Sequence, residues 1–273
     1  MHHQAITAPA ALQDAIQGFW YTCIDFAAFP AGFEIVPDGS AEIIFHFGQP
    51  CRIAAPGGHA QALPSPFLMG LLSQPVRLHG EGLLHIIGVK CFPWTVFDLL
   101  GLPAGGGGVR TFAHPIAGLQ PLLTKLVEAG RIEAALALTQ EYFVQARQGV
   151  APDSTLAKAG EAMRAAGGTL PVSQVAEAAH ATVRTLERKF KQAAGRTVKD
   201  VSGLLRFEQV RNHLWLHPEA NLAALAHELG YSDQAHLNRE FKRYSGTSPA
   251  AFARNARQGQ QVFSDAFVAF LQA

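Results

Sequence analysis

The sequence of 273 residues predicts an α+β protein of two domains: a small β-barrel or sandwich with flanking helices, then an all-α domain. Short apolar runs separated by Gly and Pro turns predict the β part. A helical motif that occurs twice predicts two helix-turn-helix motifs joined by a long helix. The charge also changes between the halves: residues 1–154 hold 7 Lys+Arg and 11 Asp+Glu, whereas residues 155–260 hold 15 and 9. A basic half beside an acidic half is typical of a nucleic-acid-binding domain with a non-binding companion.

The first 20 residues predict little beyond a short helix, and His2 and His3 are interpreted as incidental. Short apolar runs then alternate with turns from Tyr21 to Pro93, and Pro37-Asp38-Gly39-Ser40 is one such turn. This alternation predicts strands over residues 20–95 that form the barrel or sandwich.

The barrel interior is a candidate site for a small effector, because small barrels often enclose one apolar or aromatic molecule. The residues expected to line it are aromatic: Phe45, Phe47, Phe67, Phe92 and Trp94. The alternative, that these side chains are simply core, stays open. We expect no metal and no cofactor, because no close pair occurs among His46, His59, His79 and His85.

Cysteine usage and hydropathy limit the class of protein further. Cys23, Cys51 and Cys91 are widely spaced, which favours three reduced thiols, with a redox-sensing thiol as the alternative. No run reaches the roughly 18 consecutive apolar residues of a membrane span, and the first residues do not resemble a signal peptide. We therefore expect a cytoplasmic protein without a membrane partner.

Helices are expected within residues 94–148, with one or two turns over Trp94 to Leu100 and a flexible loop over Gly105 to Gly108. Apolar residues at helical spacing predict a pair of helices over Pro115 to Ala129 and Ile132 to Ala146. Gly149 to Thr155 is the predicted linker, so the domains are expected to span residues 1–150 and 155–257. An amphipathic helix over residues 258–273 carries Phe263, Phe267 and Phe270.

The stretch from Leu222 to Pro249 has the pattern of a helix-turn-helix. A short amphipathic helix ends at Gly230, Ser232 can cap a second helix, and that helix has a polar, basic outer face. Two helices that meet through a short glycine turn are typical of this motif. A helical hairpin with a merely solvated face is the alternative.

A second copy of the motif argues against that alternative. Leu186, Phe190 and Gly195 each lie 51 residues before Leu237, Phe241 and Gly246. The long helix predicted over Val198 to Leu216 would join the two copies. Their second helices could then enter successive major-groove segments about 34 Å apart.

The spacing of residues in each second helix separates an inner from an outer face. In the first copy, Val183, Leu186 and Phe190 are predicted to point inward. The outward side chains are arginine, glutamine, asparagine, glutamate and lysine, which pair well with base edges and phosphates.

These residues resemble the AraC/XylS family of bacterial transcription factors. GYSDQAHLNREFKRYSGTSPAAF is similar to the family signature, and LERKFKQAAGRTVKDVSGLLRFEQVRNHL to its first helix-turn-helix and connecting helix. One departure is His180, because members of the family more often have a glycine in the first turn. A left-handed residue is expected at this position, and histidine tolerates that conformation. The resemblance implies base contacts by Arg184, Glu187, Arg188, Gln234, Asn238 and Arg239. It implies phosphate contacts by Lys191, Lys242 and Arg243. VPDGSAEIIFHFG, GLLSQPVRL and IIGVKCFPW resemble the cupin-like sensor half of a subgroup of these regulators.

The function implied by this resemblance is a sequence-specific transcription regulator, an activator on family grounds. Its partners would be double-stranded DNA, a small-molecule effector, RNA polymerase and a second copy of the chain. In relatives the helical pair of the first domain often supplies a dimer interface; the alternative, that both helices only complete the core, stays open. Two alternatives are a ligand-binding or interaction protein that does not bind specific DNA, and an enzyme in the β domain. The sequence has no GxSxG, HExxH or P-loop motif, so we expect no enzyme activity.

Overall fold

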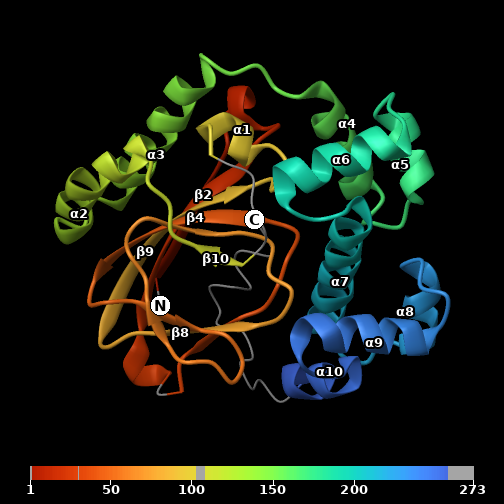
Figure 1. Cartoon of the computed structure of the whole chain (residues 1–273). Helices are drawn as coiled ribbons and strands as arrows, with labels where there is room; N and C mark the ends of the chain where they lie inside the picture. Colours follow the sequence, from red (N-terminus) through yellow and green to blue (C-terminus); the bar gives the residue numbers. More distant parts are fainter. Residues whose placement is uncertain (1, 30, 103–107, 258–273) are drawn as a thin grey trace.

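The computed structural model describes residues 2–29, 31–102 and 108–257. A sheet-rich half and a helical half lie side by side, and the chain passes from one to the other after helix α3 (Figure 1). The α+β architecture that the sequence predicts is therefore confirmed. The helix predicted over residues 258–273 and the loop Gly105 to Gly108 fall wholly or mostly outside the described residues. No described helix is long and apolar enough to cross a membrane.

The sheet-rich half contains two sheets whose neighbouring strands are antiparallel. The larger sheet has the strand order β1 (His2–Thr7), β2 (Ile16–Asp25), β9 (Leu83–Cys91), β4 (Ala41–Gly48), β7 (Phe67–Met69) and β10 (Val109–Arg110). The smaller sheet has the order β3 (Phe33–Ile35), β8 (Val76–His79), β5 (Arg52–Ala54) and β6 (Gln61–Ala62).

The beginning of the chain differs from the expectation of a short helix. Residues 2–7 form strand β1, which pairs along β2 with His2 opposite Cys23 and Thr7 opposite Gly18. Only residues 10–12 form a single 3-10 turn. The first residues have little strand signal of their own, and β2 supplies the hydrogen-bonding edge that orders them.

The larger sheet is buried on both faces. Successive side chains of a strand point to opposite sides, so Ile43, Phe45 and Phe47 of β4 face one way, and Glu42 and Ile44 face the other. The first group packs in one core with Leu123, Leu136 and Phe143 of the flanking helices. Those helices are α1 (Val96–Leu100), α2 (Gln120–Glu128) and α3 (Ile132–Arg147), so the predicted helical pair is present.

The helical half contains α4 (Ser154–Ala165), α5 (Val172–Ala178), α6 (Val183–Ala194), α7 (Val198–Leu216), α8 (Leu222–Glu228), α9 (Gln234–Ser245) and α10 (Pro249–Arg257). Helix α7 runs between the α5/α6 pair and the α8/α9 pair (Figure 1), with the bounds that the sequence predicts. Phe207 of α7 lies 5.1 Å from the ring of Phe241 in α9. A capping box at Thr197 and Asp200 begins α7.

The internal repeat is visible residue by residue. Helices α6 and α9 each have twelve residues, and each ends at a left-handed glycine, Gly195 (φ 67°) or Gly246 (φ 73°). The turns before them contain His180 (φ 50°) and Gly230 (φ 71°). The predicted left-handed histidine is thus confirmed. Because these two residues are 50 apart and the helices 51 apart, the second turn is one residue longer.

The two halves share an apolar contact centred on Trp94. This side chain is fully buried, and its ring lies 5.4 Å from Phe92 and 5.8 Å from Phe190 of α6. A Cβ atom added at Gly160 of α4 would lie 2.3 Å from the indole. The guanidinium of Arg164 stacks 3.8 Å above the Phe92 ring. The sheet-rich half is thereby anchored to the helices that carry the first helix-turn-helix.

Candidate nucleic-acid interface and ligand cavity

Helix α6 presents a row of exposed side chains along one side. Its N-cap Thr182 accepts a hydrogen bond from the backbone N–H of Thr185 at 3.2 Å, while Leu186 and Phe190 are fully buried. The exposed residues at helical spacing are Arg184, Arg188 and Lys191. Buried apolar residues on one side of the helix therefore fix which charged residues face solvent.

Two residues of α6 differ from the sequence-based assignment. Val183, predicted to point inward, is 43% exposed. It lies at the first turn of the helix, where a valine methyl group can contact the methyl group of thymine. Glu187 is only half-buried, and its Oε2 accepts a hydrogen bond from the backbone N–H of Val198 at 3.3 Å. This carboxylate helps to cap α7, and such a tertiary contact leaves no pattern in the sequence.

Helix α9 repeats the arrangement with other side chains. Gln234, Arg239, Lys242 and Arg243 are exposed and Asn238 is half-buried. Asp233, not Ser232, is the N-cap, because its Oδ1 accepts from the backbone N–H of His236 at 2.6 Å. Arg243 lies 4.0 Å from Asp200 of α7.

An ion pair fixes α9 against α7. Arg206 of α7 reaches Glu240 of α9 at 3.2 Å and donates to the carbonyl of Gly168 at 2.9 Å. Both charged side chains are largely buried, at 14% exposure. Because removing one partner would leave the other charge poorly solvated, this pair holds the exposed face of α9 at a fixed orientation to α7.

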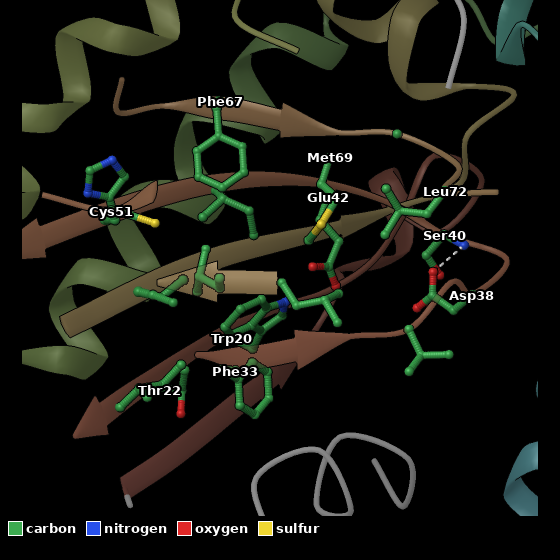
Figure 2. Close-up of a pocket in the computed structure, with 18 of the residues that line it drawn as sticks. Trp20, Thr22, Phe33, Asp38, Ser40, Glu42, Cys51, Phe67, Met69 and Leu72 are labelled. Carbon is green, nitrogen blue, oxygen red and sulfur yellow. Dashed lines mark hydrogen bonds between the residues drawn. The ribbon is translucent and has the colours of Figure 1, made fainter. Parts of the chain in front are cut away.

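A cavity with a volume of about 130 Å³ lies between the two sheets. Trp20, Phe33 and Phe67 lie around it in Figure 2, and apolar side chains of β4, β7, β8 and β9 complete most of the wall. Its polar residues include Asp38, Ser40 and Glu42. A cavity of about 150 Å³ in another protein holds a benzene ring, so the space suits one ring-sized ligand.

The aromatic set expected to line this space is only partly present there. Phe67 lines the cavity. Phe45 and Phe47 lie on the opposite face of the larger sheet, under the flanking helices. Phe92 and Trp94 belong to the core shared with the helical half. Alternation in β4 separates Ile43, Phe45 and Phe47 from Glu42, Ile44 and His46, but alternation alone could not tell which of the two faces meets the cavity. No sequence pattern pointed to Trp20 or Glu42 as lining residues.

The acidic end of the cavity contains two neighbouring carboxyl groups. Burial raises the pKa of Glu42 to about 8, and the charge of nearby Asp38 adds to the shift. Lys90 and a hydrogen bond from the Trp20 side chain act in the opposite direction. Burial also raises the pKa of Asp38, although Lys90 lies 4.0 Å away. Glu42 therefore holds a proton at neutral pH.

A pH-dependent stability follows from Glu42. Between its ordinary pKa of 4.5 and about 8, the folded chain keeps a proton that the unfolded chain has lost, so stability falls as pH rises. The variant Glu42→Gln should have the same unfolding temperature as wild type at pH 4.5, and an unfolding temperature about 4–8 °C higher than wild type at pH 9. This temperature shift corresponds to about 2 kcal/mol in the free energy of unfolding. The value is smaller than the pKa shift alone would give, because the Glu42 side chain is partly exposed and solvent screens its charge.

The measurement is thermal unfolding of both proteins across this pH range. Glu81→Gln is the matched control, because Glu81 is exposed outside the cavity. Parallel stability curves for wild type and Glu42→Gln would show that Glu42 ionises normally.

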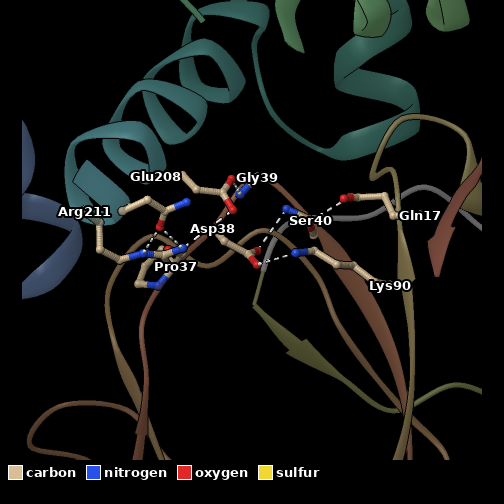
Figure 3. Close-up of polar contacts among 9 residues, drawn as sticks. Gln17, Pro37, Asp38, Gly39, Ser40, Lys90, Glu208 and Arg211 are labelled. Atoms are coloured by element: carbon tan, nitrogen blue, oxygen red, sulfur yellow. Dashed lines mark hydrogen bonds and ion pairs between the residues drawn. The ribbon is translucent and has the colours of Figure 1, made fainter. Parts of the chain in front are cut away.

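The loop between β3 and β4 joins the acidic end of the cavity to α7. Nη1 of Arg211 donates to the carbonyl of Pro37 at 3.2 Å, and the backbone N–H of Gly39 donates to Glu208 Oε2 at 3.4 Å (Figure 3). The side chain of Arg211 is 1% exposed and lies 3.6 Å from Glu208. This loop (Pro37–Ser40) therefore contacts both the cavity and the helix between the two motifs.

The described part of the chain offers no group of three potential metal ligands. Burial raises the pKa of Cys51 to about 12 and that of Cys91 well above its usual value. These two thiols stay protonated near neutral pH, and the thiolate is the reactive form. The redox alternative therefore gains no support from them.

Comparisons with known proteins concern the two halves separately. Residues 175–255 match the model of a family described as a helix-turn-helix domain, and residues 4–106 match a domain of unknown function (DUF6597). The HTH-type transcriptional activator RhaS from Escherichia coli (strain SE11) is 37% identical over 89 residues, 33% of this chain and 30% of RhaS. The chain thus spans about a third of the length of the curated relatives it matches.

Solved structures resemble the chain at lower identity. A transcriptional regulator with an AraC-type DNA-binding domain from Chromobacterium violaceum is 22% identical, with a TM-score of 0.35 over 38% of this chain and 93% of its own. ToxT from Vibrio cholerae strain SCE256, bound to an unsaturated fatty acid, is 8% identical. Its TM-score is 0.48, and the match covers 85% of this chain and 93% of the ToxT chain. Because the match to the helix-turn-helix family model covers α6 through α9, the C-terminal half of the chain contains a helix-turn-helix domain, and part of the chain is similar in sequence to the transcriptional activator RhaS.

Proposed function

We propose that this chain is a sequence-specific, DNA-binding transcription regulator, and that it acts as an activator. The observation that carries the proposal is the pair of helices α6 and α9, which repeat at an interval of 51 residues on either side of α7. Each exposes arginine and lysine beside a residue suited to base contact. Two such helices in one chain can read two successive major-groove segments.

The residues divide into two roles. We assign base contacts to Arg184, Arg188, Gln234, Asn238 and Arg239, and add Val183 for its exposed methyl groups. Glu187 is left out of this set because it caps α7. Phosphate contacts are assigned to Lys191, Lys242 and Arg243 near the C-terminal ends of the helices. Arginine matches guanine and glutamine or asparagine matches adenine, whereas lysine on phosphate carries no sequence information.

The other half is assigned to control. We propose two domains, 1–150 and 155–257, with the first binding a small effector between its sheets. DNA is then the main partner and RNA polymerase the second, both in the cytoplasm. The flanking pair α2 and α3 is the candidate surface for a homodimer, because Leu122 of α2 is 51% exposed. No catalytic role is assigned to either domain.

Selection of bound duplexes from a random pool tests the proposal. We expect a motif of two blocks about one helical turn apart. Recovery of no motif, or binding indifferent to sequence, would favour a ligand-binding protein without specific DNA contacts.

Lys242→Ala tests the phosphate role. We expect weaker binding to every duplex alike and a slope of log affinity against log salt that is smaller by about 1, because one phosphate contact releases about one counterion. Titrations at several salt concentrations measure this slope. The control is Lys158→Ala, which removes an exposed lysine of α4, outside both motifs. A loss confined to some sequences would assign Lys242 to base contact instead.

A further inference from the structure

The cavity between the sheets is lined mostly by apolar side chains but has acidic side chains at one end. Most of its lining is apolar, whereas Asp38 and Glu42 place two carboxyl groups at one end, with the hydroxyl of Ser40 nearby (Figure 2). Among the described residues that line it, none is lysine or arginine. Lys90 lies outside the lining, 4.0 Å from Asp38, and is one cation beside two carboxyl groups. A ligand carboxylate would meet the two acidic groups in the cavity and, among the described lining residues, no lysine or arginine, so the cavity suits a base better than an acid.

We propose that this cavity binds a small apolar molecule with one protonated amine, held by Asp38 and Glu42, and that the loop Pro37–Ser40 transmits its presence to α7. An ammonium group between two carboxylates forms charge-assisted hydrogen bonds with both. Its positive charge also removes their mutual repulsion. The apolar part of the ligand, about one ring in size, would fill the space beside Trp20, Phe33 and Phe67.

The shifted ionisation of Glu42 supports the same ligand class. The pKa of Glu42 rises because its charge is poorly solvated and Asp38 repels it. A nearby cation favours the ionised form of a carboxyl group. An amine therefore compensates the cost of ionising Glu42, whereas a neutral ligand leaves that cost unchanged.

The link to α7 depends on Asp38, which belongs to both regions. It lines the cavity, and it lies in the loop that Arg211 and Glu208 hold through Pro37 and Gly39. A ligand ammonium group would attract the Asp38 carboxylate toward the cavity. It would therefore compete with Lys90 and Arg211, whose positive charges also act on Asp38. The loop then holds α7 differently, and α7 carries both helix-turn-helix motifs. This second half of the inference rests on the proposed DNA-binding function.

Binding is tested with three matched probes: 2-phenylethylamine, 2-phenylethanol and 3-phenylpropionic acid. Isothermal titration of the full chain at pH 7 should give an affinity for the amine at least tenfold above that for the alcohol, and still weaker binding of the acid. Glu42→Gln and Asp38→Asn should each lower the affinity for the amine about tenfold and leave the alcohol unchanged. Glu81→Gln, the exposed control, should bind like wild type.

Three results would overturn the ligand class. These are strongest binding of the acid, equal binding of all three probes, or no binding of any probe by protein whose circular dichroism is that of the folded chain. Loss of amine binding in Glu81→Gln as well would show that the effect is one of net charge and not of the cavity.

The route to α7 is tested with the DNA site obtained by selection. Saturating 2-phenylethylamine should change DNA affinity at least threefold in wild type. In Glu208→Ala, which loses the bond to Gly39, the change should fall below twofold while amine binding persists. An unchanged DNA affinity in wild type would overturn the route alone. A chain that binds the amine but no specific DNA would instead overturn the proposed function and leave the ligand class standing.

Discussion

Replacing Trp94 by alanine is expected to separate the two halves of the molecule and to lower the free energy of unfolding by about 3–5 kcal/mol. The indole is fully buried and is the largest of the completely buried side chains. It fills the space between Phe92 and Phe190 and lies against Gly160 of α4. Its removal leaves a cavity at the contact on which the docking depends.

Calorimetry and limited proteolysis measure the separation. Wild type should unfold in one transition, whereas Trp94→Ala should show two and be cleaved faster between α3 and α4. Gly160→Ala, on the α4 side of the contact, should also separate the two halves, because the added Cβ atom would lie 2.3 Å from the indole.

The control for this experiment is Gly118→Ala, where an added Cβ atom has no heavy atom within 4 Å. It should unfold like wild type. A single transition at an unchanged temperature in both Trp94→Ala and Gly160→Ala would show that the contact contributes little to docking.

Arg184→Ala and Arg239→Ala are expected to change the sequence that the protein selects, each in its own half of the site. A bidentate arginine–guanine contact is worth about 1–3 kcal/mol against the wrong base, so affinity for the best duplex should fall about 5- to 150-fold. Both side chains are exposed on helices whose opposite faces are buried, so we expect the fold to be retained.

Duplex selection with each variant separates base reading from general attraction. The block contacted by α6 should lose definition in Arg184→Ala, and the block contacted by α9 in Arg239→Ala. Lys158→Ala again serves as the control for loss of one positive charge. A uniform loss of affinity, with both blocks unchanged, would place these arginines on phosphates.

The helical half follows closely from the sequence because its determinants are local. Apolar spacing, left-handed glycines at Gly195 and Gly246, and the repeat of 51 residues identify α6, α9 and their relation. Helix α7 has its predicted bounds because Thr197 and Asp200 form a capping box at its start. The capping of α9 by Asp233 in place of Ser232 is a shift of one residue, within the usual uncertainty of a helix end.

The candidate sites depended on contacts between distant residues. Glu187 has the outward spacing of a base-reading residue, yet it caps α7. Val183 has inward spacing, yet at the first turn no neighbouring helix covers it completely, and it is 43% exposed. The spacing of side chains along a helix predicts which residues share a face, but it does not predict which other part of the protein covers that face.

Patterns of nearby residues predict the α+β class, the two helix-turn-helix motifs, their connecting helix and the polar faces that they expose. These features depend on interactions between residues a few positions apart, so the local sequence contains them. Three further features arise from packing between distant segments: β1 pairs with β2, Trp94 docks the halves, and the face of β4 with Glu42, not the face with Phe45, meets the cavity. They depend on which strand face and which strand edge find a partner, and the residues of that partner lie far away in the sequence.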